Sequence, residues 1–349
     1  MRNSRTREVT LRDVARAAGV HYSTASRSLD PINVRLINPA TVVRVQQAAQ
    51  ELGYRPDLVA RGLRRGRTGT IGIVVADLAN PYIAPVLRGI AESLESRGVM
   101  PLIVETLDDQ ARLKRLLATL LSRRIDAIIT SAARRGYADI LTEVANAGTP
   151  VVLAVRDLAN SGLPVVTHDD LRGGELAARH LIELGHRRLT QLRGPSDIQS
   201  FSDRGEGFER YARSVRAAVV GVTEMARTPD VAEGRRLMER VLAEVKPLPT
   251  GIFAHNDLMA VGALEALDTA GLRCPEDVSL VGYNDVQLAS HIAPPLTTIR
   301  LPGEALGRIA GEMALGLLDQ PDVRPASVSL PPTLVPRGST APMRYAMAV

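Results

Sequence analysis

The alternation of apolar runs with amphipathic segments, which starts at Thr70, is the feature that most restricts the fold. Runs such as "TIGIVVA", "PLIVET", "AIITSA" and "PVVLAV" are apolar throughout, and segments with helical periodicity separate them. In "PYIAPVLRGIAESLESRG", for example, Val86, Ile90 and Leu94 share one helical face. Strands that are apolar on both faces predict a parallel sheet covered by helices on both sides.

A second series of the same kind follows. It begins at "VVTHDD" and continues through "GELAARHLIELG", "RRLTQLRG", "GFERYARSV", "VTEMA", "VAEGRRLMERVLAEV", "TGIFAHN", "DLMAVGALEALDTAG" and "VSLVGYND". The chain closes with "PPLTTIRLP", an expected helix from Gly303 to about Leu318, and the strand-like "SVSLPPTLVPRGST". Two tandem α/β units predict two lobes. Because ligands of such sheets bind beyond the carboxyl ends of the strands, the cleft between the lobes is the expected pocket.

The first 70 residues differ from the rest in charge. They hold 13 Arg, no Lys and five acidic residues, whereas the remainder holds 30 basic and 33 acidic residues. This asymmetry indicates a polyanionic partner for the N-terminal piece. A solvated basic tail is the alternative, but it is weakened because the Arg residues are interleaved with apolar positions at helical spacing.

Three short helices are expected within this basic segment. "TLRD", which begins at Thr10, resembles a capping box, and Gly19 tolerates the positive φ that ends a helix. A second helix is expected at about 22–29. The third, "NPATVVRVQQAAQELG", has Asn38 as its N-cap and Gly53 at its end. A glycine turn between the first two helices predicts a helix-turn-helix.

Composition argues against several classes of protein. With 45% hydrophobic and 23% charged residues, the chain can bury a sizeable core. The single cysteine, Cys274, allows no intramolecular disulfide and fits a reducing cytoplasm. The six His residues are scattered, so no metal site or cofactor is expected. The basic N-terminus lacks the apolar run of a secretory signal, and no apolar segment reaches the ~18 residues of a membrane helix.

The motifs and their order resemble the lactose-repressor (LacI/GalR) family of bacterial transcription regulators, over about residues 9–340. "VTLRDVARAAGV" with "STASRSL" is similar to the family's helix-turn-helix, and "ELGYRPDLVARGLRRGRTGTIGIV" to its third helix, hinge and first core strand. "NPYIAPVLRGI", "RHLIELGHRR", "HNDLMAVGALEAL", "GLRCPEDVSLVGYND", "PPLTTIR" and "LVPRGST" follow in family order. The resemblance implies an N-terminal all-α helix-turn-helix domain and an α/β two-lobed core of the periplasmic-binding-protein type I fold.

The resemblance also implies a domain division and a function. The expected domains are a helix-turn-helix at 8–55, a hinge helix and linker at 56–69, and an effector-binding and dimerisation core at 70–340. Lobe 1 is expected at about 70–164 and 299–327, and lobe 2 at about 165–298 and 328–340. The implied function is transcriptional repression by a cytoplasmic homodimer. Its partners would be a palindromic double-stranded operator and a small-molecule effector, which would be a sugar or a sugar-derived or anionic metabolite.

By family position, the second helix enters the major groove of DNA. Tyr22, Ser23 and Arg27 would face the bases, where an Arg fork suits guanine. Four further residues would contact phosphates and set the register: Thr10, Thr24, Ser26 and Asn38. Ala25 is expected to pack inside the domain. His21 stands where a small residue is usual, so a cationic His21 near a phosphate and a neutral His21 that caps the helix both remain open.

The hinge would contact the minor groove through Ala60 and Leu63, with Leu63 wedged between base pairs. Asp57 stands where Asn is common in the family, and Gly62 where a small polar residue is usual. Because Gly costs ~1 kcal/mol in a helix relative to Ala, the hinge is expected to depend on DNA to fold.

Five residues are carried over to the effector pocket. Tyr82 and Ile83 would line it from lobe 1, Arg204 would be its basic clamp, and Asn256 and Asn284 would contribute from lobe 2. An Arg fork suits a carboxylate, a phosphate or a vicinal hydroxyl pair.

Two departures from the family pattern bear on the effector. Asn284 and Val155 stand where the family often has Asp, which shifts the expectation modestly toward an anionic or less hydroxylated ligand. For His255, Asp257 and Asp285, capping or lobe-structure roles are as plausible as effector contacts.

Two other classes of function fit less well. A transport or chemoreception protein with this core would carry a signal peptide and no helix-turn-helix. An enzyme is not indicated, because the chain contains no Gly-x-Ser-x-Gly elbow and no phosphate-binding loop. No leucine-heptad tail is visible, so a dimer is expected rather than a tetramer.

Overall fold

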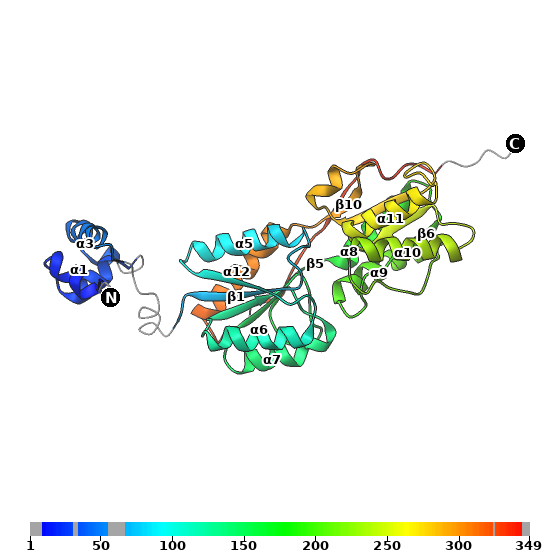
Figure 1. The fold of residues 1–349 in the computed structure, drawn as a ribbon. Coiled ribbons are helices and arrows are strands. Elements are labelled where there is room, and N and C mark those ends of the chain that lie inside the picture. The colour runs from blue at the N-terminus through cyan, green and yellow to red at the C-terminus, as the bar shows by residue number, and fades with distance from the viewer. Residues whose placement is uncertain (1–8, 31–33, 55–66, 324, 344–349) are drawn as a thin grey trace, which may run out of the picture. The chain divides into compact units, whose positions relative to one another are not determined.

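The computed structural model describes residues 9–30, 34–54, 67–323 and 325–343. The chain divides into a small N-terminal unit, up to residue 68, and a larger unit from residue 69 onward (Figure 1). The hinge positions Ala60 and Leu63, together with Asp57 and Gly62, lie outside the described residues, so the predictions made for them remain predictions.

The N-terminal unit is a three-helix domain. It contains α1 (Leu11–Ala17), α2 (Tyr22–Ser28), the short 3-10 turn η1 (Val34–Leu36) and α3 (Pro39–Glu51). Three predicted helix signals are confirmed. At the start of α1, the Thr10 N–H and hydroxyl both donate to the Asp13 carboxylate, at 3.0 and 2.6 Å. After α1, Gly19 has the positive φ of a helix end, at +61°. At the start of α3, the Asn38 side chain accepts from the Ala40 N–H at 2.9 Å. The core consists of small residues, which lets short helices pack closely: Val14, Ala15, Ala18, Ala25, Val45, Ala48 and Ala49.

Lobe 1 of the larger unit is a parallel sheet with helices on both faces. Its strand order is β11-β5-β4-β3-β1-β2. The strands are β1 (Thr70–Val75), β2 (Met100–Glu105), β3 (Ala127–Thr130), β4 (Val151–Ala154), β5 (Val165–His168) and β11 (Val328–Leu330). Figure 1 shows α5 (Ile83–Glu95) on one side of the sheet, where α12 (Gly303–Asp319) packs against it, and α6 (Gln110–Ser122) and α7 (Ala138–Asn146) on the other.

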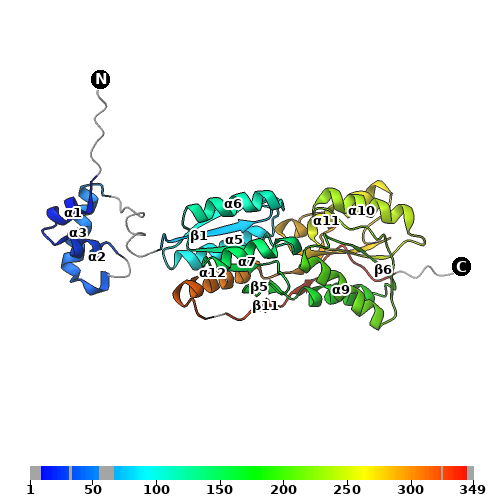
Figure 2. The ribbon, with the colours of Figure 1, turned by 90° about the horizontal axis from the view of Figure 1, so that it is seen from below.

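Lobe 2 repeats this design with the strand order β12-β10-β9-β8-β6-β7. The strands are β6 (Arg188–Leu192), β7 (Ala218–Val219), β8 (Gly251–Ala254), β9 (Ser279–Asn284), β10 (Thr297–Arg300) and the antiparallel β12 (Thr333–Val335). Figure 2 shows α10 (Val231–Glu244) and α11 (Asp257–Thr269) on one side and α9 (Gln199–Ser214) on the other, where α8 (Asp170–Glu183) joins it. Short 3-10 turns lie at η2 (Arg135–Tyr137) and η3 (Gln287–Ser290). The run "VTEMA", at 222–226, forms no strand.

The lobe boundaries differ from those expected. The sequence division placed 165–168 and 328–330 in lobe 2, but β5 pairs with β4 and β11 pairs with β5, so both strands belong to lobe 1. The expected boundary at 298–299 also falls inside β10, which lies wholly in lobe 2. The reason is that an apolar run specifies a strand but not its partner. The chain therefore crosses between the lobes after β5, after β10 and after β11.

Paired glycines bring the covering helices into backbone contact. The pairs are Gly89 and Gly307 between α5 and α12, Gly174 and Gly207 between α8 and α9, and Gly234 and Gly262 between α10 and α11. A Cβ at Gly207 would lie 1.9 Å from the carbonyl oxygen of Leu171. A Cβ at Gly174 would lie 2.0 Å from the carbonyl oxygen of Arg204. No side chain fits there, so α9 is held directly against α8, and this contact fixes Arg204 beside the start of α8.

Candidate functional site

The outer face of α2 carries the residues that were expected to contact DNA. Tyr22 and Arg27 are exposed, and Ser23, Thr24 and Ser26 are half-buried. Residues at positions i, i+1, i+4 and i+5 lie on one side of a helix, so Tyr22, Ser23, Ser26 and Arg27 can meet one surface. On the opposite side Ala25 is fully buried, which confirms that it packs. The remaining two candidates, Thr10 and Asn38, are exposed at the starts of α1 and α3.

His21 caps the start of α2. Its Nδ1 accepts a hydrogen bond from the Ser23 N–H at 3.3 Å and lies 2.8 Å from the Ser23 hydroxyl. This contact has the geometry of a helix N-cap, so it fits the capping alternative for His21. The Ser23 hydroxyl is thereby turned toward His21, and it would have to share or leave this contact to reach a base.

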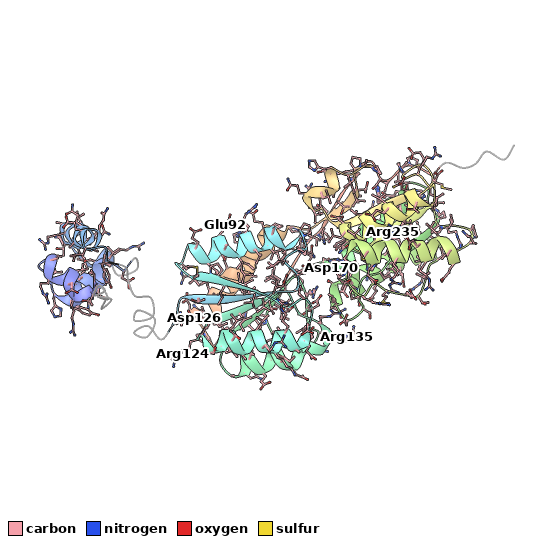
Figure 3. All side chains as sticks on the ribbon, in the orientation of Figure 1. Glu92, Arg124, Asp126, Arg135, Asp170 and Arg235 are labelled. Atoms are coloured by element: carbon pink, nitrogen blue, oxygen red, sulfur yellow. The ribbon has the colours of Figure 1, made fainter. Side chains whose placement is uncertain are left out.

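Arg204 lies at the centre of a buried cluster where the lobes meet. Its Nε donates to Asp170 Oδ1 at 2.8 Å, and its Nη1 donates to the backbone carbonyl of His255 at 2.7 Å. Its guanidinium lies 4.0 Å from the ring centroid of Tyr283 and 4.8 Å from that of Phe201. Figure 3 places Asp170 at the junction of the lobes. The predicted basic clamp therefore has a carboxylate partner, which the sequence analysis did not identify.

The electrostatics of this pair follow from burial and contact. Burial raises the pKa of Asp170, while Arg204 and the Tyr283 hydroxyl, 2.8 Å from Asp170 Oδ1, oppose that rise. Burial lowers the pKa of Arg204, but Asp170, Tyr283 and Tyr82 together outweigh it and the pKa is raised overall. Because a guanidinium stays protonated in proteins, Asp170 is its counter-ion.

Tyr82 and His168 approach this cluster from lobe 1. The Tyr82 hydroxyl is hydrogen-bonded to Nε2 of His168, and the other ring nitrogen, Nδ1, is buried with no hydrogen-bond partner among the described residues. Burial, helped by the charge of Arg204, lowers the pKa of His168 to about 3, so the ring is neutral. The hydroxyl of Ser131, which follows β3, is likewise buried and unpartnered within the described ranges, and Ile83 is buried beside Tyr82. Unpaired buried polar atoms cost ~1–3 kcal/mol each, so each of these two atoms calls for a partner such as a water or a ligand group.

The two asparagines expected in the pocket have different surroundings. Asn256 caps α11, since its Oδ1 accepts from the Met259 N–H and its Nδ2 donates to the Pro229 carbonyl, both at 2.7 Å. Asn284 ends β9 with φ +108°, and its side chain has no hydrogen bond to any described residue. Its amide is therefore available to a ligand, whereas that of Asn256 is occupied within lobe 2.

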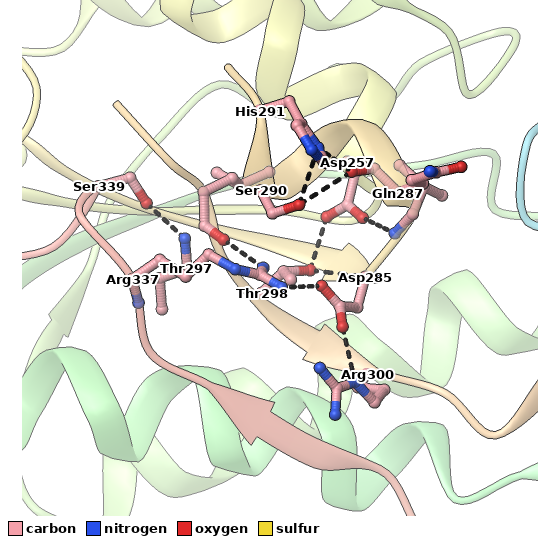
Figure 4. A network of polar contacts seen from close by, with 12 residues as sticks. Asp257, Asp285, Gln287, Ser290, His291, Thr297, Thr298, Arg300, Arg337 and Ser339 are labelled. Atoms are coloured by element: carbon pink, nitrogen blue, oxygen red, sulfur yellow. Dashed lines mark hydrogen bonds and ion pairs between the residues drawn. The ribbon is translucent and has the colours of Figure 1, made fainter. Parts of the chain in front are cut away.

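The two aspartates whose roles were left open both stabilise lobe 2 (Figure 4). Asp257 accepts from the Thr298 hydroxyl at 2.6 Å, and burial raises its pKa to about 7. Asp285 lies between Arg300 and Arg337, with a nitrogen–oxygen distance of 2.6 Å to each. These contacts use both carboxylates inside the lobe, which supports the structural alternative for them.

His255 has a supporting position behind Arg204. Its Nε2 lies 2.9 Å from Gln191 Oε1, and its Nδ1 accepts from the Gly194 N–H at 3.3 Å. Burial lowers its pKa well below the usual range for histidine, so it is neutral. Its ring stacks on Phe201 with centroids 6.3 Å apart. These contacts again favour a structural role.

The sequence analysis missed two residues of the cluster, His168 and Asp170. A signal was present in "VVTHDD", because His168 ends an apolar strand and Asp170 follows two residues later, at the sheet edge where ligands bind. In the part of the chain that the structure describes, no three His, Cys, Asp or Glu side chains are grouped to hold a metal ion. No helix within the described ranges has the length and apolarity needed to span a membrane.

Comparison with known proteins agrees with this architecture. The family described as "Bacterial regulatory proteins, lacI family" matches residues 10–57, and the "Periplasmic binding protein-like domain" matches residues 178–340. The ribose operon repressor of Escherichia coli (strain K12) is 32% identical over 95% of this chain and 99% of its own length. The chain belongs to the lacI family.

Other members of the lacI family support the same assignment. The HTH-type transcriptional repressor PurR of Aliivibrio fischeri (strain ATCC 700601 / ES114) is 30% identical over 95% of this chain and 98% of its own. Among solved structures, the lac repressor dimer bound to operator and the anti-inducer ONPF has a TM-score of 0.82 at 27% identity, covering 96% of this chain and all of that one. A lacI-family regulator from Enterococcus faecium with bound ribose has a TM-score of 0.70 at 26% identity, covering 79% of this chain and all of that one. The protein is a DNA-binding transcriptional regulator, and the predicted fold class is confirmed.

Proposed function

We propose that this lacI-family member represses transcription as a homodimer that binds a palindromic operator through α2, under the control of a small-molecule effector between its lobes. The observation that carries the proposal is the outward face of α2, which carries Tyr22, Ser23 and Arg27 while Ala25 is buried on the opposite side. Relatives named as repressors, and a lac repressor dimer seen on its operator, support it. The effector acts by stabilising one arrangement of the lobes over another.

Within this proposal, each DNA-facing residue has a role. The Arg27 guanidinium donates to a guanine edge, and Tyr22 and Ser23 contact neighbouring bases. Thr10, Thr24, Ser26 and Asn38 hold phosphates, while Ala60 and Leu63 belong to the minor groove.

Selection of operator sequences from a random duplex library tests this assignment. The wild-type chain should select a palindrome, and Arg27→Ala should lose preference at one base pair of each half-site, worth ~1–3 kcal/mol of discrimination. The control is Arg213→Ala, which removes an exposed Arg from α9 of lobe 2 and should leave the selected sequence unchanged. An identical palindrome for wild type and Arg27→Ala would remove Arg27 from the base-reading set.

The dimer proposal is supported by the exposed edge of lobe 1. Strand β2 lies at the end of its sheet, with Met100 62% and Ile103 43% exposed. An open strand edge with large apolar side chains can pair with other chains and aggregate unless another surface covers it. We propose that a second copy of the chain covers this edge. Met100→Lys with Ile103→Lys should give monomers by analytical ultracentrifugation, and a dimer that persists at low concentration would contradict this interface.

The effector is proposed to be an uncharged, hydroxyl-rich molecule. Asp170 compensates the charge of Arg204, and His168 and His255 are neutral, so an anionic effector would have to displace Asp170. This charge balance argues against the anionic ligand that the sequence favoured. A hydroxyl can both donate and accept, so it can pair with His168 Nδ1 in either tautomer.

Titration calorimetry with ribose and ribose 5-phosphate tests the effector class. Ribose is included because a structural relative holds it. A neutral compound should bind more tightly than the phosphate, and Asp170→Asn should shift the preference toward the phosphate. Tighter binding of the phosphate by the wild type would contradict the proposal.

We further propose that the site between the lobes binds its ligand without catalysing a reaction and that the protein works in the cytoplasm, where operator DNA is located. With a pKa of about 3, His168 stays neutral and is a poor proton carrier near neutral pH. The carboxylate of Asp170 is held by Arg204 and Tyr283. Incubation with the bound ligand, followed by mass spectrometry, should return the ligand unchanged.

A further inference from the structure

A second set of charged side chains joins the two lobes, apart from the Arg204 cluster. Arg134 follows β3 in lobe 1, and its Nε and Nη2 donate to the two carboxylate oxygens of Asp197 at 2.6 and 2.8 Å. Asp197 belongs to lobe 2, in the loop between β6 and α9. The Arg135 N–H also donates to the backbone carbonyl of Asp197 at 2.9 Å, and Figure 3 shows Arg135 at the end of lobe 1 that faces lobe 2. Arg134 and Arg135 of lobe 1 therefore both form hydrogen bonds to Asp197 of lobe 2.

Lobe 1 holds Arg134 in place for this contact. Asp108 Oδ2 lies 3.5 Å from Arg134 Nη1, and the Asp108 carboxylate is itself held by Arg156 at 2.6 and 3.2 Å. The Tyr137 hydroxyl donates to the Asp108 backbone carbonyl at 2.7 Å. The side chains of Arg134, Asp108 and Arg156 are only 17%, 15% and 11% exposed. Because Arg134 is already ordered, pairing with Asp197 costs little additional side-chain entropy.

The contact also affects the ionisation of Asp197. Its pKa is lowered, chiefly by the hydrogen bonds from Arg134, as expected for a carboxylate that accepts two of them.

We propose that Arg134 and Asp197 form an interlobe clamp that sets the effector concentration at which this regulator responds. The proposal rests on the effector site proposed above, where Tyr82 and His168 come from lobe 1 and Arg204 and Asn284 from lobe 2. Only closed lobes present both halves of that site. The apparent dissociation constant rises as the closed fraction falls, so a stronger clamp makes the regulator more sensitive.

Distances between spin labels on the full-length, effector-free protein test the clamp directly. The background is Cys274→Ser, with labels at Asn146→Cys on α7 of lobe 1 and Arg213→Cys on α9 of lobe 2, both exposed positions. Asp197→Asn and Arg134→Gln should each lengthen and broaden the distance distribution. The matched control is Asp277→Asn, which breaks a similar two-bond pair with Arg273, at 2.9 and 3.0 Å, inside lobe 2. If the clamp variants give the same distribution as the control, the clamp is refuted.

Binding of ribose, measured by calorimetry, tests the consequence for the effector. Each clamp variant should bind roughly three- to tenfold more weakly, because a partly exposed, two-bond ion pair is worth little more than a surface pair. The double variant should be no weaker than either single variant, since both remove the same interaction. Additive losses would refute the clamp. If the wild type does not bind ribose, the proposed effector chemistry is at fault, and the label distances still decide the clamp.

Discussion

Removing the counter-ion of Arg204 is the sharpest test of the buried cluster. In Asp170→Asn, Arg204 keeps its hydrogen bond to the His255 carbonyl but loses the carboxylate 2.8 Å from its Nε. Both side chains are about 5% exposed or less, so water cannot screen the remaining charge. Leaving one member of a buried pair without its partner costs ~3–5 kcal/mol, so we expect the core's free energy of unfolding to fall by that amount.

Urea denaturation followed by circular dichroism, at one fixed protein concentration, measures this loss. The matched control is Asp169→Asn, because Asp169 is the N-cap of α8 and Asn caps equally well, so that change should stay within ~0.5 kcal/mol. The double variant Asp170→Asn with Arg204→Met should recover most of the loss, since it removes the unpaired charge. A cost below ~1 kcal/mol for Asp170→Asn, similar to that of the control, would show that Arg204 does not depend on Asp170 and would remove the basis for a neutral effector.

Two further predictions concern stability. Gly207→Ala places a Cβ 1.9 Å from the Leu171 carbonyl oxygen, so it should lower the free energy of unfolding by ~3 kcal/mol or more and reduce the melting temperature. The control Gly316→Ala on α12 has open space at its Cβ and should be neutral or slightly stabilising. Equal melting temperatures for the two variants would contradict the backbone contact. In the folded chain His168 has a pKa of about 3, below the usual 6.5 of a histidine, so the unfolded chain takes up its proton first as the pH falls. Its contribution to stability is present above pH 6.5 and is lost as the pH falls toward 3, by up to ~1.4 kcal/mol per pH unit. His168→Gln should flatten this part of the stability profile, and an unchanged slope would mean that His168 is protonated in the native state.

Helix ends were predictable from the sequence where the local geometry requires a particular type of residue. Asn38 and Gly19 marked helix ends because a side-chain acceptor and a positive φ are needed there, and the structure confirms both. The two-lobed sheet was predictable because buried parallel strands are apolar throughout. Strand partners were not, so β5 and β11 were assigned to the wrong lobe: pairing depends on chain segments that are distant in sequence.

The sequence predicted where the residues of the candidate site lie, but not which side chains they pair with. Arg204 does lie where the lobes meet, yet its partner Asp170 is 34 residues away in the sequence, on a different helix. The close contact of α8 and α9 through Gly174 and Gly207 brings them together, and no local pattern records that contact. Asn256 was placed in the pocket by family position, but its amide is used to cap α11.

The order in which the strands occur along the chain has a consequence for synthesis. Lobe 1 receives its edge strand β11 at Val328–Leu330, and lobe 2 receives β12 at Thr333–Val335. Neither sheet can therefore be completed until these residues have left the ribosome, whereas the helices of the N-terminal unit are contiguous and precede residue 55. Because contiguous units fold first during translation, the DNA-binding helices can form on a nascent chain whose regulatory lobes are still incomplete. Under the proposed dimeric arrangement, operator binding by such a chain would have to wait until lobe 1, which carries the proposed dimer edge, is finished.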